Sequence, residues 1–505
     1  MALPECRHNA PELLAPAGGM EQLAAAVLYG ADAVYLATDR FGMRARATNF
    51  SLEELPCAVQ MAHAAGVRVY AACNILMSGE DIAKLPAYYE ALAAAGVDAV
   101  IVGDLGAASL AVKYAPRMAL HVSTQASVAN AEAARVWHEL GARRVVCARE
   151  MSLEEIAQMR ADTPPELEIE AFVHGAQCMA VSGRCLISSY LTGRSGNKGN
   201  CTQPCRWNYA LEEEKRPGEF FPVEEDAHGT FIMNAKDLNM LAYVRELAAA
   251  GVSSLKIEGR NKKAFYVATV VNAYRRVIDG ASPAEVAPEL ETVSHRPYST
   301  GFYFGEASQA PYYDGYEQTC LHAADVLACD LSDELMSDGE AALRAREGVF
   351  DGGDTFDASG AVSSQGSSAG GRSWQVEVRC RNRFAEGDEL EVLAPGCEAF
   401  SVIVRNLVWL PDLDPAAQDG SAVQDALAPA PHPVPVAVAN RSAARYRFTV
   451  YADELKGVSS ALQTADDAPC APCAPCASNV PSGSRVPLAP GWFLRSRQFR
   501  RSARH

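Results

Sequence analysis

The first 280 residues alternate between two patterns of hydrophobic and polar positions. Short, nearly continuous apolar runs are followed by Ala-rich segments that have apolar residues at helical spacing and end at Gly. The runs are typical of strands buried on both faces of a parallel sheet, and the Ala-rich segments of helices that cover such a sheet. Eight runs fit the strand pattern, at residues 12–17, 32–37, 68–74, 98–104, 119–125, 144–150, 168–175 and 253–259.

Eight strand–helix units predict an α/β fold of the (β/α)8 type, a TIM-like barrel over residues 1–280. An open dinucleotide-binding sheet is disfavoured because no G-x-G-x-x-G follows the first strand. Residues 176–236 form a long insertion between the seventh and eighth strands. The seventh strand ends near His174, so the insertion begins at the C-terminal face of the barrel, where the active sites of such barrels lie.

The pattern changes beyond residue 280. Residues 281–320 have no long periodicity and are interpreted as a connecting segment. In residues 374–384, Trp374, Val376, Val378 and Cys380 fall on one face of a strand, which indicates a small antiparallel β domain, barrel-like, over residues 321–436. Residues 330–373 are predicted to be a flexible acidic insertion and residues 437–505 a disordered tail, since both are poor in apolar residues.

Charge and hydropathy restrict the partners and the cellular location that the sequence predicts. The formal net charge is −17, so a nucleic-acid partner would have to bind a local basic surface. The first residues have no basic segment followed by a long apolar one, and each apolar run is interrupted by Gly, Asp or Arg. These features predict a cytoplasmic protein without a membrane span.

The insertion contains four cysteines in the pattern C-x6-C-x15-C-x3-C, namely Cys178, Cys185, Cys201 and Cys205. A reducing compartment does not maintain structural disulfides, so clustered thiols there indicate a metal centre. The spacing differs from the paired C-x2-C of zinc ribbons and is compatible with four-thiolate ligation of an iron–sulfur cluster. Zinc, or ordinary buried thiols, are the alternatives that the spacing leaves open.

The chain resembles peptidase family U-32. The resemblance spans about residues 12–305 and extends into RNRFAEGDELEVLAPG of the β domain. It is carried by ELLAPAG, YGADAVYL, the loop of residues 44–50, HGAQCMAVSGRCLISSYLTGR, NCTQPCRW, EKRPGEFFPVEEDAHGTFIMNAKDL, SLKIEGR and HRPYSTGF. Family members support oxygen-independent hydroxylation, and the resemblance implies conversion of the tRNA wobble uridine to 5-hydroxyuridine. It also implies a 4Fe–4S cluster held by the four cysteines, and prephenate as the linked metabolite and hydroxyl donor.

The resemblance implies partners as well as cofactors. They are the tRNA anticodon loop, prephenate and the machinery that assembles iron–sulfur clusters. Arg184, Arg194, Lys198 and Arg206 lie among the cysteines, where cations offset the charge of a thiolate cluster or contact tRNA phosphates. The alternative interpretation of these four residues is a solvated charged loop.

Three further candidates come from the strand ends. Arg260 follows the eighth strand, and its guanidinium can bind a prephenate carboxylate bidentately, with Arg44 or Arg46 as second choices. Glu258 is the candidate carboxylate at the same strand end, and the alternative for Arg260 is an ion pair with it. His174 is a proton donor, a fifth ligand or a hydrogen-bonding support.

Other functions stay open at this stage. The sequence has neither the metalloprotease motif H-E-x-x-H nor a G-x-S-x-G in the strand–turn–helix context of a nucleophile elbow, which weighs against the peptidase activity in the family name. Hydroxylation of a ribosomal RNA cytidine, or a non-catalytic iron–sulfur scaffold for a hydroxylating partner, are further alternatives. Tyr298, Phe302 and Tyr303 are predicted to pack the junction between the two domains or to stack on an unpaired base.

Overall fold

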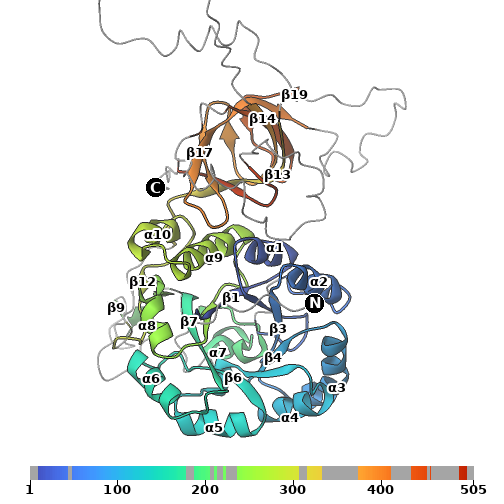
Figure 1. The fold of residues 1–505 in the computed structure, drawn as a ribbon, viewed down its shortest axis with the longest axis vertical. Coiled ribbons are helices and arrows are strands. Elements are labelled where there is room, and N and C mark those ends of the chain that lie inside the picture. The colour runs from blue at the N-terminus through green and yellow to red at the C-terminus, as the bar shows by residue number, and fades with distance from the viewer. Residues whose placement is uncertain are drawn as a thin grey trace, which may run out of the picture. The chain divides into compact units, whose positions relative to one another are not determined.

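In the computed structural model, the N-terminal part of the chain forms a closed barrel of eight parallel strands (Figure 1). Consecutive strands pair in chain order, and the eighth strand pairs with both the first and the seventh. The strands are β1 (Glu12–Pro16), β2 (Ala33–Leu36), β3 (Arg68–Cys73), β4 (Ala99–Val102), β5 (Ala119–Val122), β6 (Ala142–Val146), β7 (Glu168–Ala176) and β11 (Ser254–Ile257). The predicted (β/α)8 barrel is therefore confirmed.

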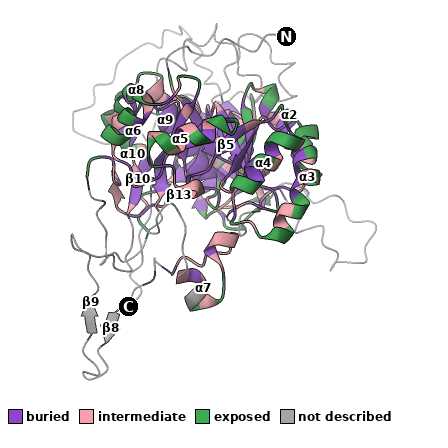
Figure 2. Cartoon of the chain, turned by 90° about the horizontal axis from the view of Figure 1, so that it is seen from below, coloured by how far each residue is buried: buried purple, intermediate pink, exposed green. Residues whose placement is uncertain are grey.

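Helices alternate with these strands and cover the barrel. Figure 2 shows the strands as buried, while the helices expose their outer faces. Ser78 and Ser152 begin two of the helices with capping boxes, in which Asp81 and Glu155 complete the second hydrogen bond. The helices are α1 (Met20–Leu28), α2 (Leu55–Ala64), α3 (Gly79–Ala94), α4 (Leu105–Tyr114), α5 (Ala131–Glu139), α6 (Leu153–Ala161), α8 (Val244–Ala249) and α9 (Ala264–Ile278), followed by α10 (Pro283–Leu290).

The structure describes only part of the chain. The described residues are 10–43, 48–177, 187–204, 207, 210–212, 220–222, 236–305, 307, 316–331, 373–410, 434–451, 455 and 488–497. Within them, no helix is long and apolar enough to cross a membrane.

The long connection between β7 and β11 has structure of its own. It contains α7 (Ile187–Thr192), a short hairpin and β10 (Asp237–Asn239). The hairpin pairs β8 (Ala210–Glu212) with β9 (Phe220–Pro222). Strand β10 runs antiparallel to β7, and β12 (Tyr298–Ser299) pairs with β10, so the segment after α10 returns to the barrel sheet.

A network of buried charges lies near the N-terminal ends of the barrel strands. Arg144 Nη1 lies 2.7 Å from Glu12 Oε1 and 3.0 Å from Glu170 Oε2, and Lys256 Nζ lies 2.7 Å from Glu170 Oε1. Tyr70 donates its hydroxyl to Glu12 at 2.8 Å. Burial alone would raise the pKa of Glu12, but Arg144 and Arg68 beside it hold this pKa below its usual value. The barrel interior is therefore joined by ion pairs as well as by apolar packing.

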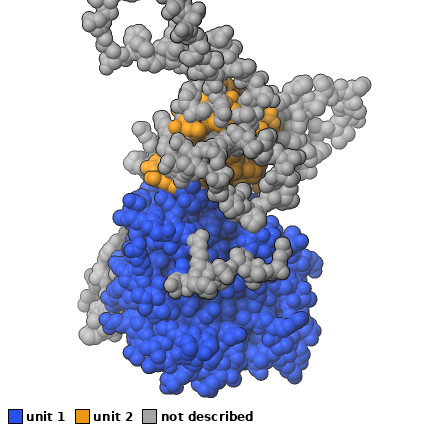
Figure 3. Space-filling view, viewed as in Figure 1, with its two compact units in different colours: residues 1–319, 395–397, 468–475 blue, residues 320–394, 398–467, 476–505 orange. Residues whose placement is uncertain are grey.

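The chain divides into two compact units, coloured separately in Figure 3. The first consists of residues 1–319 with two short later segments, and the second of most of residues 320–505. The second unit contains an eight-stranded antiparallel sheet, in the order β17-β16-β22-β13-β14-β21-β18-β19. Its strands are β13 (Leu321–Leu331), β14 (Ser373–Cys380), β16 (Glu389–Leu393), β17 (Phe400–Ile403), β18 (Arg405–Trp409), β19 (Val434–Pro435), β21 (Arg445–Tyr451) and β22 (Phe493–Ser496), and β15 (Phe384–Ala385) pairs with β20 (Val438–Ala439) beside it.

The alternation read in residues 374–384 is confirmed, because Trp374, Val376, Val378 and Cys380 are all buried. The prediction of a disordered tail over residues 437–505 was wrong at β20, β21 and β22. Strand β21 pairs with β14 and β18, and β22 lies between β13 and β16. Residues 445–451 alternate like any half-buried strand, whereas β22 is too short to recognise alone. Most of the predicted acidic insertion lies outside the described residues.

Candidate active site

Two charged side chains meet at the C-terminal ends of β6 and β11. Arg149 follows β6 and Glu258 follows β11, and Nη2 of the first lies 4.0 Å from Oε2 of the second. The Arg149 guanidinium also lies 4.3 Å from the centre of the Phe172 ring. Arg149 and Glu258 therefore form a shielded pair at the barrel mouth. The sequence predicted Glu258 and missed Arg149, although Arg149 lies near the end of the apolar run at residues 144–150.

Arg260 lies just beyond this pair and is only 3% exposed. A Cβ atom on Gly42 would come within 3.5 Å of Arg260 Nη1, so the guanidinium lies against the backbone that follows β2. A Cβ on Gly18 would come within 2.0 Å of the Arg260 carbonyl oxygen, so only glycine fits at that position. This close approach ties the ELLAPAG motif to the SLKIEGR motif. The other candidates, Arg44 and Arg46, lie outside the described residues.

His174 is in β7 and is buried among aromatic rings. The centres of the Tyr266, Tyr274 and Tyr298 rings lie 6.1, 5.6 and 5.5 Å from the centre of the imidazole. Among the residues that the structure describes, neither ring nitrogen of His174 has a hydrogen-bond partner. Burial lowers the pKa of His174 from 6.5 to about 3, because the charged form is poorly solvated there. The imidazole is therefore neutral near pH 7.

This burial predicts a loss of stability in acid. The pKa of His174 is about 3 in the folded state and near 6.5 in the unfolded state, so the unfolded state binds the proton first as pH falls. Between pH 7 and pH 5 this residue should lower the free energy of unfolding by about 2 kcal/mol. In urea titrations at the two pH values, His174→Phe should lose about 2 kcal/mol less than the wild type. Equal losses of unfolding free energy in the two proteins would contradict a buried, neutral His174.

The insertion is anchored beside the barrel mouth. The backbone N–H of Leu76, in the loop after β3, donates to the carbonyl of Asn197 at 2.9 Å, and Lys198 forms an ion pair with Asp81. Lys198 thus has a carboxylate partner within the protein, whereas Arg194 is exposed to solvent.

Cys201 is the one predicted metal ligand within the described residues. Its half-buried Sγ accepts the backbone N–H of Gln203 at 3.3 Å. Ser188, Thr192 and Thr202 share hydroxyl hydrogen bonds around it, which fix the local backbone. Cys178, Cys185, Cys205 and Arg206 lie outside the described residues, so the four-thiolate set stays a prediction.

Tyr298 of the HRPYSTGF motif and Tyr303, which follows the motif, are supports within the barrel unit. Tyr303 is buried and donates its hydroxyl to the carbonyl of Phe172 at 2.6 Å. Tyr298 donates to the carbonyl of Leu290 at 3.0 Å. A buried Tyr303 cannot stack on a base, so the base-stacking alternative is wrong for this residue.

The same motif contributes a buried ion pair that the sequence did not predict. Arg296 Nη2 lies 2.6 Å from Asp237 Oδ1, and both side chains are buried. The pair joins β10 to the segment after α10. No spacing rule connects two residues this far apart in the chain, so only the fold reveals the contact.

The family model described as peptidase family U32 matches residues 18–311, which include the barrel strands from β2 to β11, the Cys-containing insertion and the HRPYSTGF motif. The chain belongs to peptidase family U32. The family predicted from the motifs is therefore confirmed. The match contains both sides of the candidate site, the strand ends of the barrel and the segment that carries the cysteines.

Curated relatives of this U32 chain are named for different activities. tRNA hydroxylation protein P from Escherichia coli is 38% identical over 58% of this chain and 74% of its own length. tRNA hydroxylation protein P1 from Bacillus subtilis is 36% identical over 79% of this chain and 87% of its own length. A protein named collagenase from Porphyromonas gingivalis is 34% identical over 58% of this chain and 74% of its own length.

Proposed function

We propose that this U32 protein hydroxylates the wobble uridine of tRNA to 5-hydroxyuridine, without molecular oxygen and with prephenate as the hydroxyl donor. The observation that carries the proposal is its similarity to proteins named for tRNA hydroxylation, which extends over most of their length. The coarser part, a role in tRNA hydroxylation, rests on those names. The 4Fe–4S cluster, the prephenate donor and the wobble uridine are what the family resemblance implies, and the site residues are compatible with them. This function would place the protein in the cytoplasm.

Cys178, Cys185, Cys201 and Cys205 would hold a 4Fe–4S cluster. Thiolates suit iron–sulfide cores, and backbone N–H bonds to the ligand sulfur are among the features that set the properties of such clusters. The hydrogen bond from Gln203 to Cys201 Sγ fits this use. A bound cluster would supply one-electron chemistry next to the barrel mouth. Assembly of the cluster would require iron–sulfur assembly machinery as a partner.

Arg260 is the proposed contact for a prephenate carboxylate, with Arg44, Arg46 and Arg206 as further candidate cations. Because Arg260 is almost fully buried, a carboxylate that binds it has to enter the barrel, where water is excluded and a charge-assisted hydrogen bond is strong. Glu258, with Arg149 beside it, is the proposed catalytic carboxylate. His174 is buried and neutral, which favours a positioning role over proton donation.

Binding of the tRNA requires a local surface of suitable chemistry, because the whole protein carries a net charge of −17. The described part of the insertion offers exposed Arg194 and Trp207, whose side chains suit a phosphate and an unpaired base. The wobble base is unpaired in free tRNA, so it can enter a pocket at little unstacking cost. The anticodon loop is therefore the proposed macromolecular partner.

Deletion of the gene in its host is expected to remove most 5-hydroxyuridine, and derivatives built on it, from tRNA. Mass spectrometry of tRNA digests measures this, and a plasmid copy with Cys201→Ala should fail to restore the nucleoside while Cys57→Ala, an exposed cysteine in α2, should restore it. Unchanged tRNA with an altered ribosomal RNA cytidine would keep the chemistry and change the substrate. Activity that needs a second protein would make this chain the scaffold.

Similarity to the protein named collagenase favours a peptidase as the second candidate function. Cleavage of gelatin or peptides by the pure protein, together with normal tRNA in the deletion strain, would replace the first proposal with this one. Retention of that cleavage in Cys201→Ala would show that the cysteine site is not part of it.

A further inference from the structure

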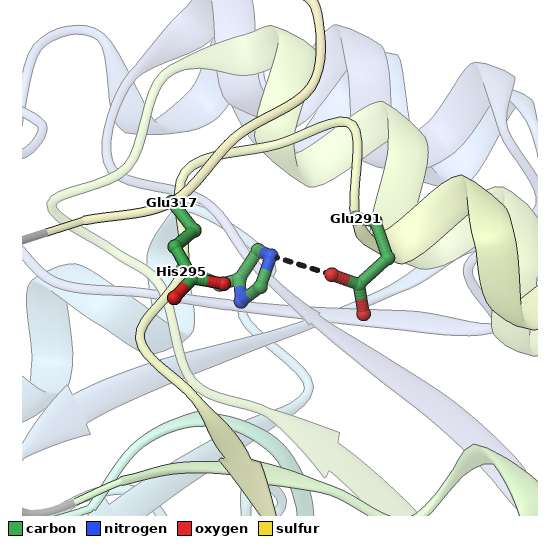
Figure 4. Close-up of side chains that lie close together, drawn as sticks. All are labelled: Glu291, His295 and Glu317. Atoms are coloured by element: carbon green, nitrogen blue, oxygen red, sulfur yellow. Dashed lines mark ion pairs between the residues drawn. The ribbon is translucent and has the colours of Figure 1, made fainter. Parts of the chain in front are cut away.

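Glu291, His295 and Glu317 bring two carboxylates and an imidazole together, as Figure 4 shows. One ligand atom from each residue lies within 4.8 Å of the others, and His295 Nε2 lies 3.1 Å from Glu291 Oε2. Glu291 follows α10, His295 precedes β12, and Glu317 precedes β13. The connection between α10 and β12 therefore contributes two ligands and the segment before β13 the third. None of the three residues belongs to the site at the barrel mouth.

The imidazole has the orientation that a metal ligand needs. His295 is buried, and its Nδ1 lies 2.8 Å from the carbonyl oxygen of Arg296. A carbonyl oxygen can only accept, so Nδ1 carries a proton, and Nε2 is the ring nitrogen that faces Glu291 and would coordinate a metal ion. Histidine ligands of metals are commonly held in this way, by a second hydrogen bond to a backbone carbonyl. The ring also stacks on Tyr298, at 4.3 Å between centres and 7° between planes.

The backbone fixes the spacing of the three residues. His295 N–H donates to the Glu317 carbonyl at 3.0 Å, and Glu317 N–H donates to the His295 carbonyl at 2.8 Å. The N–H of Thr319 donates to the Glu291 carbonyl at 2.9 Å. Ligand atoms around a tetrahedral ion lie roughly 3.3 Å apart, given metal–ligand distances of about 2.0–2.1 Å. Glu291 and His295 already meet that spacing, and rotation of the exposed Glu317 side chain can supply the third ligand.

We propose that Glu291, His295 and Glu317 bind a divalent first-row transition-metal ion that joins α10 to the segment leading to β13. Two carboxylates beside an imidazole form a site with mixed oxygen and nitrogen donors, which suits Mn²⁺ or Zn²⁺ better than the cations Mg²⁺ and Ca²⁺, which prefer oxygen ligands alone. Water would complete the coordination. The site differs in residues and donor chemistry from the cysteine set, and it is independent of the proposed tRNA chemistry.

The test uses Mn²⁺, because thiolates are soft ligands and do not compete for this ion as they would for Zn²⁺. Free Mn²⁺ is followed by electron paramagnetic resonance during titration of the full-length protein, with excess Mg²⁺ to suppress binding to the acidic surface. The wild type is expected to bind about one Mn²⁺ per chain. Glu317→Gln and His295→Gln should each weaken binding by at least about tenfold.

Glu285→Gln is the matched control, since Glu285 is an exposed carboxylate in the same helix, α10, outside the cluster. This variant should bind Mn²⁺ as the wild type does. Glu291→Gln and Glu317→Gln alter exposed side chains, so they test the proposal even if His295→Gln fails to fold. Equal affinity in the wild type, Glu291→Gln and Glu317→Gln would overturn it. So would the absence of any Mn²⁺ binding that survives the Mg²⁺ competition, which would leave an ordinary His–Glu ion pair.

Discussion

Replacing Cys201 with alanine is expected to remove most of the iron from protein purified without oxygen. The wild type should be brown and contain about four iron and four sulfide per chain, as a 4Fe–4S cluster requires. Loss of one thiolate leaves one iron of the cluster without its protein ligand, so the cluster should become labile. The same loss is expected for alanine at Cys178, Cys185 or Cys205. Iron and labile-sulfide assays, with the visible absorption spectrum, measure the effect.

Two other cysteines serve as controls for this loss. Cys57 is exposed in α2, and Cys147 is buried after β6, where burial raises the pKa of its thiol to about 12. A thiol that stays protonated is a poor metal ligand, so alanine at Cys147 should leave the iron content unchanged. Stoichiometric zinc without labile sulfide in the wild type would reject the cluster and return the four cysteines to a zinc site.

Most of the barrel could be predicted because its signals are local. Gly30, Gly96, Gly141 and Gly251 each precede an apolar run, and all four have positive φ where a helix ends, as the repeated Gly-plus-strand pattern predicted. The observed strands lie within a few residues of the predicted ones, as with β4 against residues 98–104. Strand β21 has the same kind of local alternation. It was wrongly predicted to be part of a disordered tail because residues poor in apolar side chains surround it.

The site could be predicted only where one motif held the residues. Glu258, Arg260 and Cys201 stand in family motifs, whereas Arg149 pairs with Glu258 from a strand more than a hundred residues away. Likewise, the partners of His295 are set by the return of Glu317 to the barrel unit, which no spacing rule describes. A single sequence carries no record of such contacts, because they depend on how the chain closes in space.

The buried charges of the barrel are the clearest case of such a contact, and they lead to the second large effect. Glu12, Arg144 and Glu170 come from three strands, and in the sequence each is a charged residue at the start of an apolar run or within one. In the structure, Arg144 lies 2% exposed between the two carboxylates. Removal of Arg144 would take the shared cation from both carboxylates and leave Glu12 with the partly exposed Arg68 and Glu170 with Lys256. Loss of a partner within a buried charge network is far more costly than loss of an exposed pair.

Arg144→Ala is therefore expected to lower the free energy of unfolding of the barrel by about 3–5 kcal/mol. Arg143→Ala is the matched control, because Arg143 is the preceding residue of β6 and is exposed, and it should change this free energy by less than about 0.5 kcal/mol. Hydrogen exchange of the β1 and β6 amides, followed by mass spectrometry, measures the barrel separately from the second unit. If Arg144→Ala does not fold, Arg144→Lys keeps one charge and should lose less. A loss below about 1 kcal/mol in Arg144→Ala would mean that the two buried carboxylates are neutral or solvated, and that ion pairing contributes little to the barrel.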